Sequence, residues 1–237
     1  MVNEKRSNGH RKYYVNHNVF SGRMNADKAY WIGFLMADGN ISKPKFGESQ
    51  AITLQLQSRD LNHIYKYKKF LETDKVIYST RHNCGIKGYN KQYDGYMLRI
   101  TSDKIAKRLI HCGIIPQKSG KEKLININKI YERDYFRGYV DGDGCIIYGK
   151  TYANNCVELY GSYDICKQFK DFVINHGMNT KADVHKRNYS DILYVIRISG
   201  NHNVYKLLNL LYKDTSVYLD RKYNKAMQII KRIDEHR

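Results

Sequence analysis

The segment WIGFLMADGNI, from Trp31 to Ile41, recurs later in the chain as FRGYVDGDGCI, from Phe136 to Ile146. Self-similarity at a fixed spacing indicates that one structural unit is present twice. The copies align at an offset of 105 residues, because Trp31 corresponds to Phe136. The clearest matches are the pairs Gly33 and Gly138, Phe34 and Tyr139, Asp38 and Asp143, and Gly39 and Gly144.

The similarity continues downstream of both segments. Ser58-Arg59-Asp60 corresponds to Ser162-Tyr163-Asp164, and Tyr96 to Ile100 corresponds to Tyr194 to Ile198. A helical pattern follows each serine, and further helices are predicted at 105–112 and 204–211. The apolar faces are expected to hold Leu61, Ile64, Tyr65 and Leu71 in the first copy, and Ile165, Phe169, Phe172 and Val173 in the second. A last helix, at about 217–232, places Leu219, Tyr223, Met227 and Ile230 on one stripe.

The strands predict antiparallel sheets with one packed face. In 52–57, Ile52, Leu54 and Leu56 alternate with Thr53, Gln55 and Gln57, which is typical of a sheet with one polar face. The fold class is therefore α+β, with helix, strands, helix, strands and helix in each of two pseudo-symmetric repeats. We expect an N-terminal extension at 1–25, a first repeat at 26–117, a linker at 118–130 and a second repeat at 131–237.

The charge balance favours a polyanionic partner. The 237 residues contain 41 Lys and Arg against 23 Asp and Glu, a formal net charge of +18, and such an excess usually indicates nucleic acid. The five cysteines are odd in number and lack zinc-site spacing, which favours reduced thiols. No apolar run resembles a signal peptide or membrane span. We expect an intracellular protein, cytoplasmic or organellar, that is not secreted.

Each matched segment combines small residues with an acid. Gly33 and Ala37 in one copy, and Gly138 and Gly142 in the other, form stripes that let two helices touch. Asp38 and Asp143 would then emerge side by side, where like charges require a cation such as Mg²⁺ between them. Gly39 and Gly144 are suited to ending each helix in the left-handed conformation. For one copy alone, a structural role for the aspartate as a turn former would be favoured; the duplication reverses that preference.

WIGFLMADG and FRGYVDGDG resemble the LAGLIDADG motif, and two copies about a hundred residues apart resemble the single-chain branch of that homing endonuclease family. The resemblance extends from about Tyr30 to Ile230 and implies αββαββα repeats whose two sheets form a saddle over DNA. It implies catalytic roles for Asp38 and Asp143, and metal ligation by both carboxylates and by the carbonyls of Ala37 and Gly142. Mg²⁺, or Mn²⁺, is the implied cofactor.

The resemblance also implies basic and polar residues around the acids. The candidates are Lys118, Lys222 and Arg221. Ser58 stands near a position where the family often has glutamine, with Gln57 as a possible substitute. Met36 replaces an acid of the motif that Asp141 retains, and this acid is normally not the catalytic one. A first residue Met, and no His-Asn pair at the end, lead us to expect a free-standing or intron-encoded protein rather than an intein.

The polar sheet faces are expected to contact DNA. Arg99 and Arg197 alternate with apolar neighbours and should point away from the core, toward a guanine edge or a phosphate. The expected DNA-binding residues are Thr53, Gln55, Gln57, Arg99, Glu158, Arg197 and Arg221.

The leading hypothesis is a metal-dependent, site-specific double-strand endonuclease that acts as a monomer on double-stranded DNA, without an obligate protein partner. A catalytically inactive RNA maturase or DNA-binding regulator of the same fold is the first alternative. A basic structural or ribosome-associated protein is the second, and it leaves the repeated motif unexplained.

Overall fold

The chain is described by a computed structural model that covers residues 13–83, 92–123 and 127–236. Cys84, residues 1–12 of the predicted N-terminal extension and residues 124–126 of the predicted linker lie outside these described residues. The first repeat contains α1 (Ala26–Asp38), β1 (Gly39–Ile41), β2 (Ala51–Gln57), η1 (Ser58–Asp60), α2 (Leu61–Phe70), β3 (Tyr78–Asn83), β4 (Gln92–Thr101) and α3 (Asp103–His111). The second contains η2 (Lys129–Tyr131), α4 (Glu132–Asp143), β5 (Gly144–Ile147), η3 (Tyr152–Asn154), β6 (Cys156–Gly161), α5 (Tyr163–Asn175), β7 (Val184–Lys186), β8 (Tyr194–Ser199), α6 (Asn201–Tyr212) and α7 (Asp220–Asp234).

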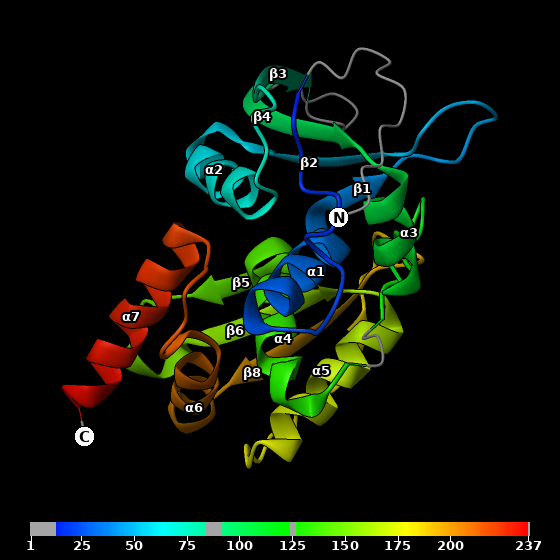
Figure 1. The fold of residues 1–237 in the computed structure, drawn as a ribbon. Helices are drawn as coiled ribbons and strands as arrows, with labels where there is room; N and C mark the ends of the chain where they lie inside the picture. Colours follow the sequence, from blue (N-terminus) through cyan, green and yellow to red (C-terminus); the bar gives the residue numbers. More distant parts are fainter. Residues whose placement is uncertain (1–12, 84–91, 124–126, 237) are drawn as a thin grey trace.

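Two antiparallel sheets of the same topology flank the paired helices α1 and α4. The strand order is β1-β2-β4-β3 in one sheet and β5-β6-β8-β7 in the other. Thr53 lies opposite Arg99 in the first sheet, and Glu158 lies opposite Arg197 at the corresponding place in the second. The sheets lie on either side of α1 and α4 (Figure 1). The predicted α+β class with two αββαββα repeats is confirmed.

The apolar residues of the strands and helices form one core. On β2, Ile52, Leu54 and Leu56 are buried as predicted, because that side of the sheet packs on the helices. The α5 face of Ile165, Phe169, Phe172 and Val173 is also buried as predicted. The α2 face was wrong in part: Tyr65 is 54% exposed. His63, Ile64 and Tyr67 are the buried residues of that helix; the rings of His63 and Tyr67 pack against Trp31 of α1, and the ring of His63 also packs against Phe34.

The orientation of the last helix was also predicted wrongly. The fully buried stripe of α7 consists of Lys222, Ala226, Ile229 and Ile233, whereas Tyr223, Met227 and Ile230 are half-buried at its margin. Because lysine is usually exposed to solvent, the sequence pattern excluded Lys222 from the buried face of the helix. The predicted buried stripe was therefore shifted by one residue along the chain. In the structure the ammonium group of Lys222 is hydrogen-bonded inside the protein, so a charged residue lies on the inward face.

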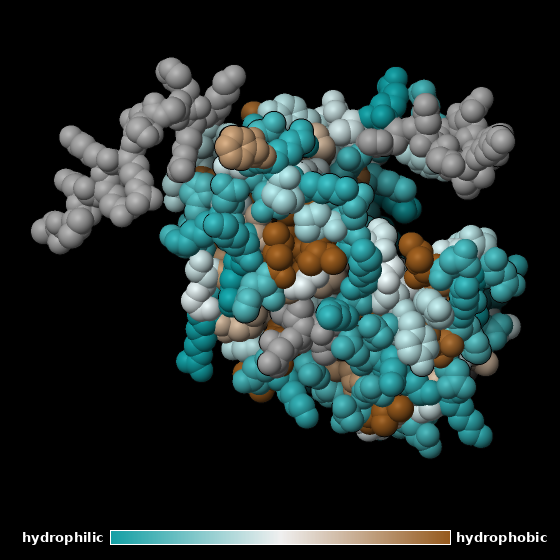
Figure 2. All heavy atoms as spheres, turned by 90° about the vertical axis from the view of Figure 1, so that its right-hand side faces the viewer, coloured by the Kyte–Doolittle hydropathy of each residue, from teal (hydrophilic) through white to brown (hydrophobic). Residues whose placement is uncertain are grey.

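The surface is consistent with a basic protein that presents polar faces. Figure 2 shows a largely hydrophilic face in which hydrophobic residues gather in small separate patches. Within the described part of the chain, no helix is both long and apolar enough to cross a membrane.

Candidate active site

Helices α1 and α4 touch backbone to backbone at two equivalent points. A Cβ atom added at Gly33 would lie 2.0 Å from the carbonyl oxygen of Tyr135, and one added at Gly138 would lie 2.0 Å from that of Tyr30. Tyr30 and Tyr135 are themselves separated by the repeat offset of 105 residues. The contact therefore has approximate twofold symmetry, and only glycine fits at either point.

The same symmetry brings the carboxyl ends of the two helices together. A Cβ added at Gly142 would lie 2.3 Å from the Cβ of Ala37 and 3.4 Å from Oδ2 of Asp38. Asp38 and Asp143 are the last residues of their helices. Two acids from sequence-distant repeats thus lie at one end of one helix pair.

The glycines that follow the acids do not adopt the predicted left-handed conformation. Gly39 has φ −76° and Gly144 has φ −89°, both in the extended region. Glycine is required there for space, because a Cβ would lie 2.6 Å from the carbonyl oxygen of Leu35 or 2.5 Å from that of Val140. The chain leaves each helix directly into the first strand of its sheet, and this tight exit fixes the backbone beside each acid.

The two carboxyl groups share an unfavourable electrostatic environment. Burial and the negative charge of Asp38 raise the pKa of Asp143 to about 7, against the opposing effect of Lys118 and Lys222. The pKa of Asp38 is also raised, chiefly because the surrounding protein atoms reduce the hydration of its charged form, although the residue is still exposed to solvent. A site that disfavours two carboxylate charges without a counterion is one where a bound cation would be stabilised.

Two lysines hold the carbonyl groups at the ends of these helices. Lys118 donates from Nζ to the carbonyl oxygen of Ala37 at 2.7 Å. Lys222 is buried and donates to the carbonyl oxygens of Val140, Asp141, Gly142 and Gly144, at 2.6, 2.6, 3.0 and 2.8 Å. Burial lowers the pKa of Lys222 to about 8, so it remains largely charged at pH 7.

The donor set suits an ion such as Mg²⁺, which keeps water or phosphate ligands, better than an ion whose ligands all come from the protein. The described residues contain no cluster of three or more His, Cys, Asp or Glu side chains that could hold a metal. Mg²⁺ is commonly held by one or two carboxylates, with water and substrate phosphates completing its shell. The carbonyls of Ala37 and Gly142, expected as ligands, already accept hydrogen bonds from the lysines, so the carboxylates are the stronger candidates.

Each acid opens onto its own hollow. A cavity of about 540 Å³ beside Asp38 is lined by Asn40, Thr53, Gln55, Leu56, Gln57, Tyr93, Asp94 and Gly95. A cavity of about 600 Å³ beside Asp143 is lined in part by Ala37, Lys118, Glu122, Gly142, Tyr160 and Ser190. The polar residues predicted on β2 thus lie beside Asp38. Ser58 belongs to η1 and does not line that cavity, whereas Gln57 does.

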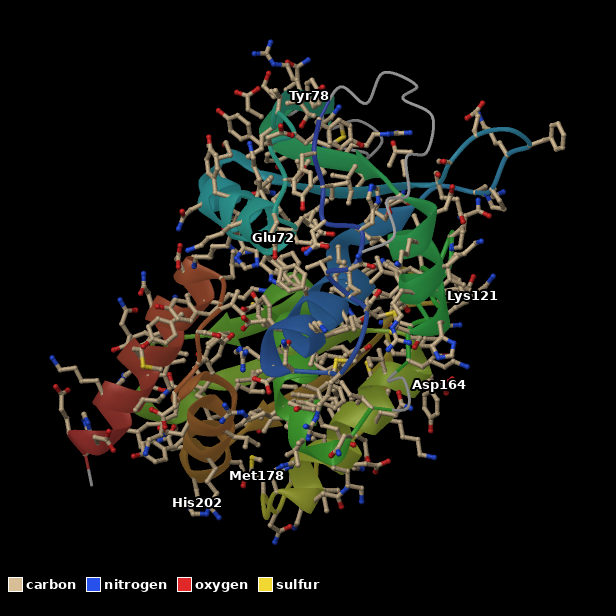
Figure 3. All side chains as sticks on the ribbon, viewed as in Figure 1. Glu72, Tyr78, Lys121, Asp164, Met178 and His202 are labelled. Carbon is tan, nitrogen blue, oxygen red and sulfur yellow. The ribbon has the colours of Figure 1, made fainter. Side chains whose placement is uncertain are left out.

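Glu122 was not identified from the sequence. Its side chain accepts hydrogen bonds from the amides of Gly120 and Ser162, at 3.0 and 3.1 Å. It therefore ties the segment that carries Lys118 to the second sheet. That segment runs along the margin of the molecule, where Figure 3 labels Lys121 near α3. A buried glutamate in a lysine-rich stretch gives no local signal, because its partners are backbone groups of distant residues.

Asp141 holds the start of α7, a role that the sequence did not indicate although the acid itself was recognised as part of the motif. Its carboxylate accepts from the hydroxyl groups of Tyr30 and Tyr212, at 2.8 and 2.7 Å, and from the amide of Leu219 at 2.8 Å. Tyr30 belongs to the first repeat, so this buried acid joins both repeats to the helix that carries Lys222. The equivalent position in the first repeat is Met36, which is buried among apolar residues.

Arg221 lies in an ion pair rather than on the open sheet face. Its Nε lies 2.9 and 3.0 Å from the two carboxylate oxygens of Asp60. Close by, Lys66 of α2 donates to Asp220 at 2.5 Å and to the carbonyl oxygen of Tyr218 at 2.8 Å. These contacts bind the start of α7 to the first repeat, and they give Arg221 a structural role that its basic charge alone did not indicate.

The remaining predicted DNA-binding residues lie on the faces of the sheets that point away from the core. Arg99 is exposed between buried Leu98 and Ile100, and Arg197 is exposed between buried Ile196 and Ile198. Thr53, Gln55 and Glu158 are half-buried, and Gln57 is exposed. Figure 3 labels Tyr78 of β3 at one end of the molecule and His202 of α6 at the other, with α1 and α4 between. The two sets of polar residues belong to two different sheets, one in each repeat.

Solved structures share this architecture over most of the chain. A K262A mutant of I-SmaMI matches with a TM-score of 0.56 and 11% identity, covering 88% of this chain and 90% of that one. The LAGLIDADG meganuclease I-AabMI, bound to uncleaved DNA, matches with a TM-score of 0.55 and 14% identity, over 90% and 91%. The homing endonuclease I-WcaI, bound to its DNA recognition sequence, matches at 0.57 and 12%, over 84% and 85%.

At the level of sequence there is no such match. No protein-family model matches the chain, and no curated protein sequence does. The similarity is therefore one of architecture, supported by the two repeated segments and by the joined helices that they form. Over nearly its whole described length, the chain has the fold of the LAGLIDADG homing endonucleases.

Proposed function

We propose that the chain is a site-specific endonuclease that hydrolyses both strands of double-stranded DNA with a divalent metal ion. The observation that carries this proposal is the position of Asp38 and Asp143, one from each repeat, at the touching ends of α1 and α4. Each acid faces a separate cavity, which suits one reaction on each strand of a duplex. Because one chain supplies both acids, we propose that it acts as a monomer.

The two carboxylates would hold the metal, and the metal would polarise a phosphate oxygen and lower the pKa of the attacking water. Mg²⁺ is the proposed ion, with Mn²⁺ as a substitute. Lys118 and Lys222 fix the carbonyls at the helix ends and so hold the backbone on which each acid sits. Their charges also favour a phosphate at this place, because they offset the two carboxylates.

The choice of DNA rests on charge, shape and related folds. The net charge of +18 favours a polyanion, and the sheets present polar side chains on both sides of the acids. The matched structures I-AabMI and I-WcaI are bound to DNA, and I-SmaMI is bound to uncleaved DNA with calcium ions. We further propose that the biological role is homing, in which such a break leads to insertion of an intron or other mobile element.

A plasmid library that carries randomised inserts tests the proposal directly. The purified chain should linearise a subset of plasmids in Mg²⁺, and sequencing of the cut ends should return one long consensus. Excess EDTA should abolish the cleavage if the metal is required. Enrichment of a consensus by binding, without any cleavage in Mg²⁺ or Mn²⁺, would overturn the enzymatic proposal and support a DNA-binding regulator.

A further inference from the structure

The polar face of the second sheet carries an acid beside an arginine. Glu158 of β6 lies directly opposite Arg197 of β8. Nη1 of Arg197 lies 3.5 Å from Oε1 of Glu158, and the side chains are 57% and 13% exposed, respectively. The arginine thus reaches outward from the sheet, while the carboxylate lies closer to it.

The neighbouring residue Tyr160 fixes the position of this carboxylate. The hydroxyl group of Tyr160 donates to Oε2 of Glu158 at 2.5 Å, and the guanidinium group of Arg187 lies 5.8 Å from the centre of the Tyr160 ring. Burial, the hydrogen bond to Glu158 and the negative charge of Glu158 together raise the pKa of Tyr160 to about 12, so this hydroxyl group remains a donor. Glu158 is therefore an oriented acceptor rather than a mobile surface acid.

A negatively charged hydrogen-bond acceptor is unfavourable on a surface that contacts DNA, unless the DNA offers it a hydrogen-bond donor. Guanine O6 and thymine O4 are acceptors in the major groove, and both would repel a carboxylate. Cytosine N4 is a donor and is the group that Glu characteristically contacts. Arginine has the opposite preference, because its two parallel donors match the adjacent acceptors N7 and O6 of guanine.

We propose that Glu158 and Arg197 together read one C·G base pair, with Arg197 on the guanine and Glu158 on the cytosine. The spacing fits, because guanine O6 and cytosine N4 are hydrogen-bonded to each other at about 2.9 Å, close to the 3.5 Å between the two side chains. The inference rests on the proposed function, since it assumes that this sheet lies in a major groove. It assigns Glu158 a selective role, in which wrong base pairs are rejected by their acceptors.

The first sheet lacks this combination. Arg99 lies opposite Thr53, the residue that corresponds to Glu158, and it forms no ion pair with any other residue that the structure describes. Thr53 carries no charge and can donate or accept, so it tolerates either base. The two halves of the DNA site should therefore differ at the equivalent position: fixed as C·G in one half, and constrained only through Arg99 in the other.

Selection of bound duplexes from a fully randomised DNA library, in Ca²⁺, tests this inference on the intact chain. The wild type should return a long consensus with an invariant C·G pair within one half. Glu158→Gln keeps the shape and removes the charge, so it should admit other pairs there, with a loss of preference of about tenfold or more. Arg197→Ala should relax the same pair, and all other positions should remain as in the wild type, which confirms that these variants are folded.

A transferred residue provides the matched experiment. Thr53→Glu should create a new C·G preference at the symmetry-related position of the other half, leaving the Glu158 position unchanged. If the wild type returns no consensus, the proposed function fails. If it returns a consensus that neither Glu158→Gln nor Thr53→Glu alters at these two positions, the function stands and the assignment of Glu158 and Arg197 is overturned.

Discussion

Lys118 and Lys222 have corresponding tasks in the two repeats, but the protein supports them differently. Each donates to a carbonyl at the end of a motif helix: Lys118, from the segment between the repeats, to that of Ala37 in α1, and Lys222 to that of Gly142 in α4. Lys118 extends from an irregular segment and makes one such bond, whereas Lys222 belongs to a helix, is buried and makes four. Similar chemistry on the two sides of the site therefore does not require similar structure.

The reason for the difference lies in Asp141 and its partners. The Asp141 carboxylate holds the first residues of α7, and Arg221 and Asp220 bind the same helix to the first repeat. Lys118 has a lighter anchor, in which Glu122 accepts two backbone amides. The second half of the site is thus braced by side chains from both repeats. The two acids therefore occupy corresponding positions, whereas the groups that support the backbone beside them differ.

The largest expected effect concerns the acids. Asp38→Asn and Asp143→Asn should each remove double-strand cleavage, by about 10²-fold or more, the size of loss typical when a charge-stabilising group is removed. Both should retain DNA binding, because an amide keeps the shape of the side chain. Cleavage would be measured as plasmid linearisation and binding by titration in Ca²⁺. Linearisation at the wild-type rate by either variant would show that the two acids are not equivalent.

The next effect concerns the symmetric helix contact. Gly33→Ala and Gly138→Ala should each lower the free energy of unfolding by about 3 kcal/mol or more, at or beyond the usual range of overpacking, because both atoms in conflict belong to backbone. The double variant should lose less than the sum, since both substitutions separate the same helices. Chemical denaturation would measure this.

The pair Ala37 and Gly142, at the other contact between α1 and α4, provides the control, because the methyl group of Ala37 can be moved to position 142 by two substitutions. Gly142→Ala alone should be destabilising, because its Cβ meets that of Ala37 at 2.3 Å. Adding Ala37→Gly moves the methyl from one helix to the other and should restore most of the lost stability. A pair that stays as unstable as Gly142→Ala alone would contradict the approximate equivalence of the two helices.

A smaller and unequal effect is expected for the lysines. Lys222→Met should lower the free energy of unfolding by about 3 kcal/mol, because buried carbonyls lose a charged donor. Lys118→Met should cost about 1 kcal/mol, since water can reach the single carbonyl that it leaves. Denaturation of the metal-free protein measures both. Equal losses would mean that the bracing of α7 does not strengthen the second half.

A further expected effect is the pH dependence of the metal-free protein. Because the pKa of Asp143 is about 7 when folded and lower when unfolded, the folded chain binds the extra proton between these values. Stability should fall as pH rises from about 4 to 7 and then level off, with at most about 1.4 kcal/mol per pH unit for one proton. Asp38→Asn should flatten this slope. A metal-free protein that grows more stable over this range through Asp143 would reverse the assigned shift.

The sequence predicted the features that repeat locally. The matched segments, the alternation on β2 and the buried face of α5 depend on periodicity, which is visible in a single chain. Lys222 and Glu122 could not be placed in this way, because their partners are backbone groups far away in the sequence. Arg221 was expected on DNA for its charge, yet Asp60 lies 161 residues away in the sequence and binds its Nε. Burial of charge depends on such distant partners, and periodicity does not reveal them.

Asp141 and Met36 show the same limit within the motif itself. The two residues correspond, and both are buried, but only Asp141 meets hydroxyl and amide donors. Its partners Tyr212 and Leu219 belong to the end of α6 and the segment before α7. The resemblance identified Asp141 as a non-catalytic acid; its task became clear only from the side chains that surround it.

The reciprocal approach of Gly33 to Tyr135 and of Gly138 to Tyr30 has a consequence for ancestry. A surface whose contact residues correspond in this way is self-complementary, so an isolated repeat carrying it could pair with an identical copy. When two such copies are joined in one chain, the glycines at the twofold axis cannot be replaced by larger residues, because each of them meets the backbone of the other repeat. Residues that make no such backbone contact are not constrained in this way, and among them the repeats differ: Met36 corresponds to Asp141, and Thr53 corresponds to Glu158. Because one chain holds both copies, the two sheets need not present the same side chains on their polar faces.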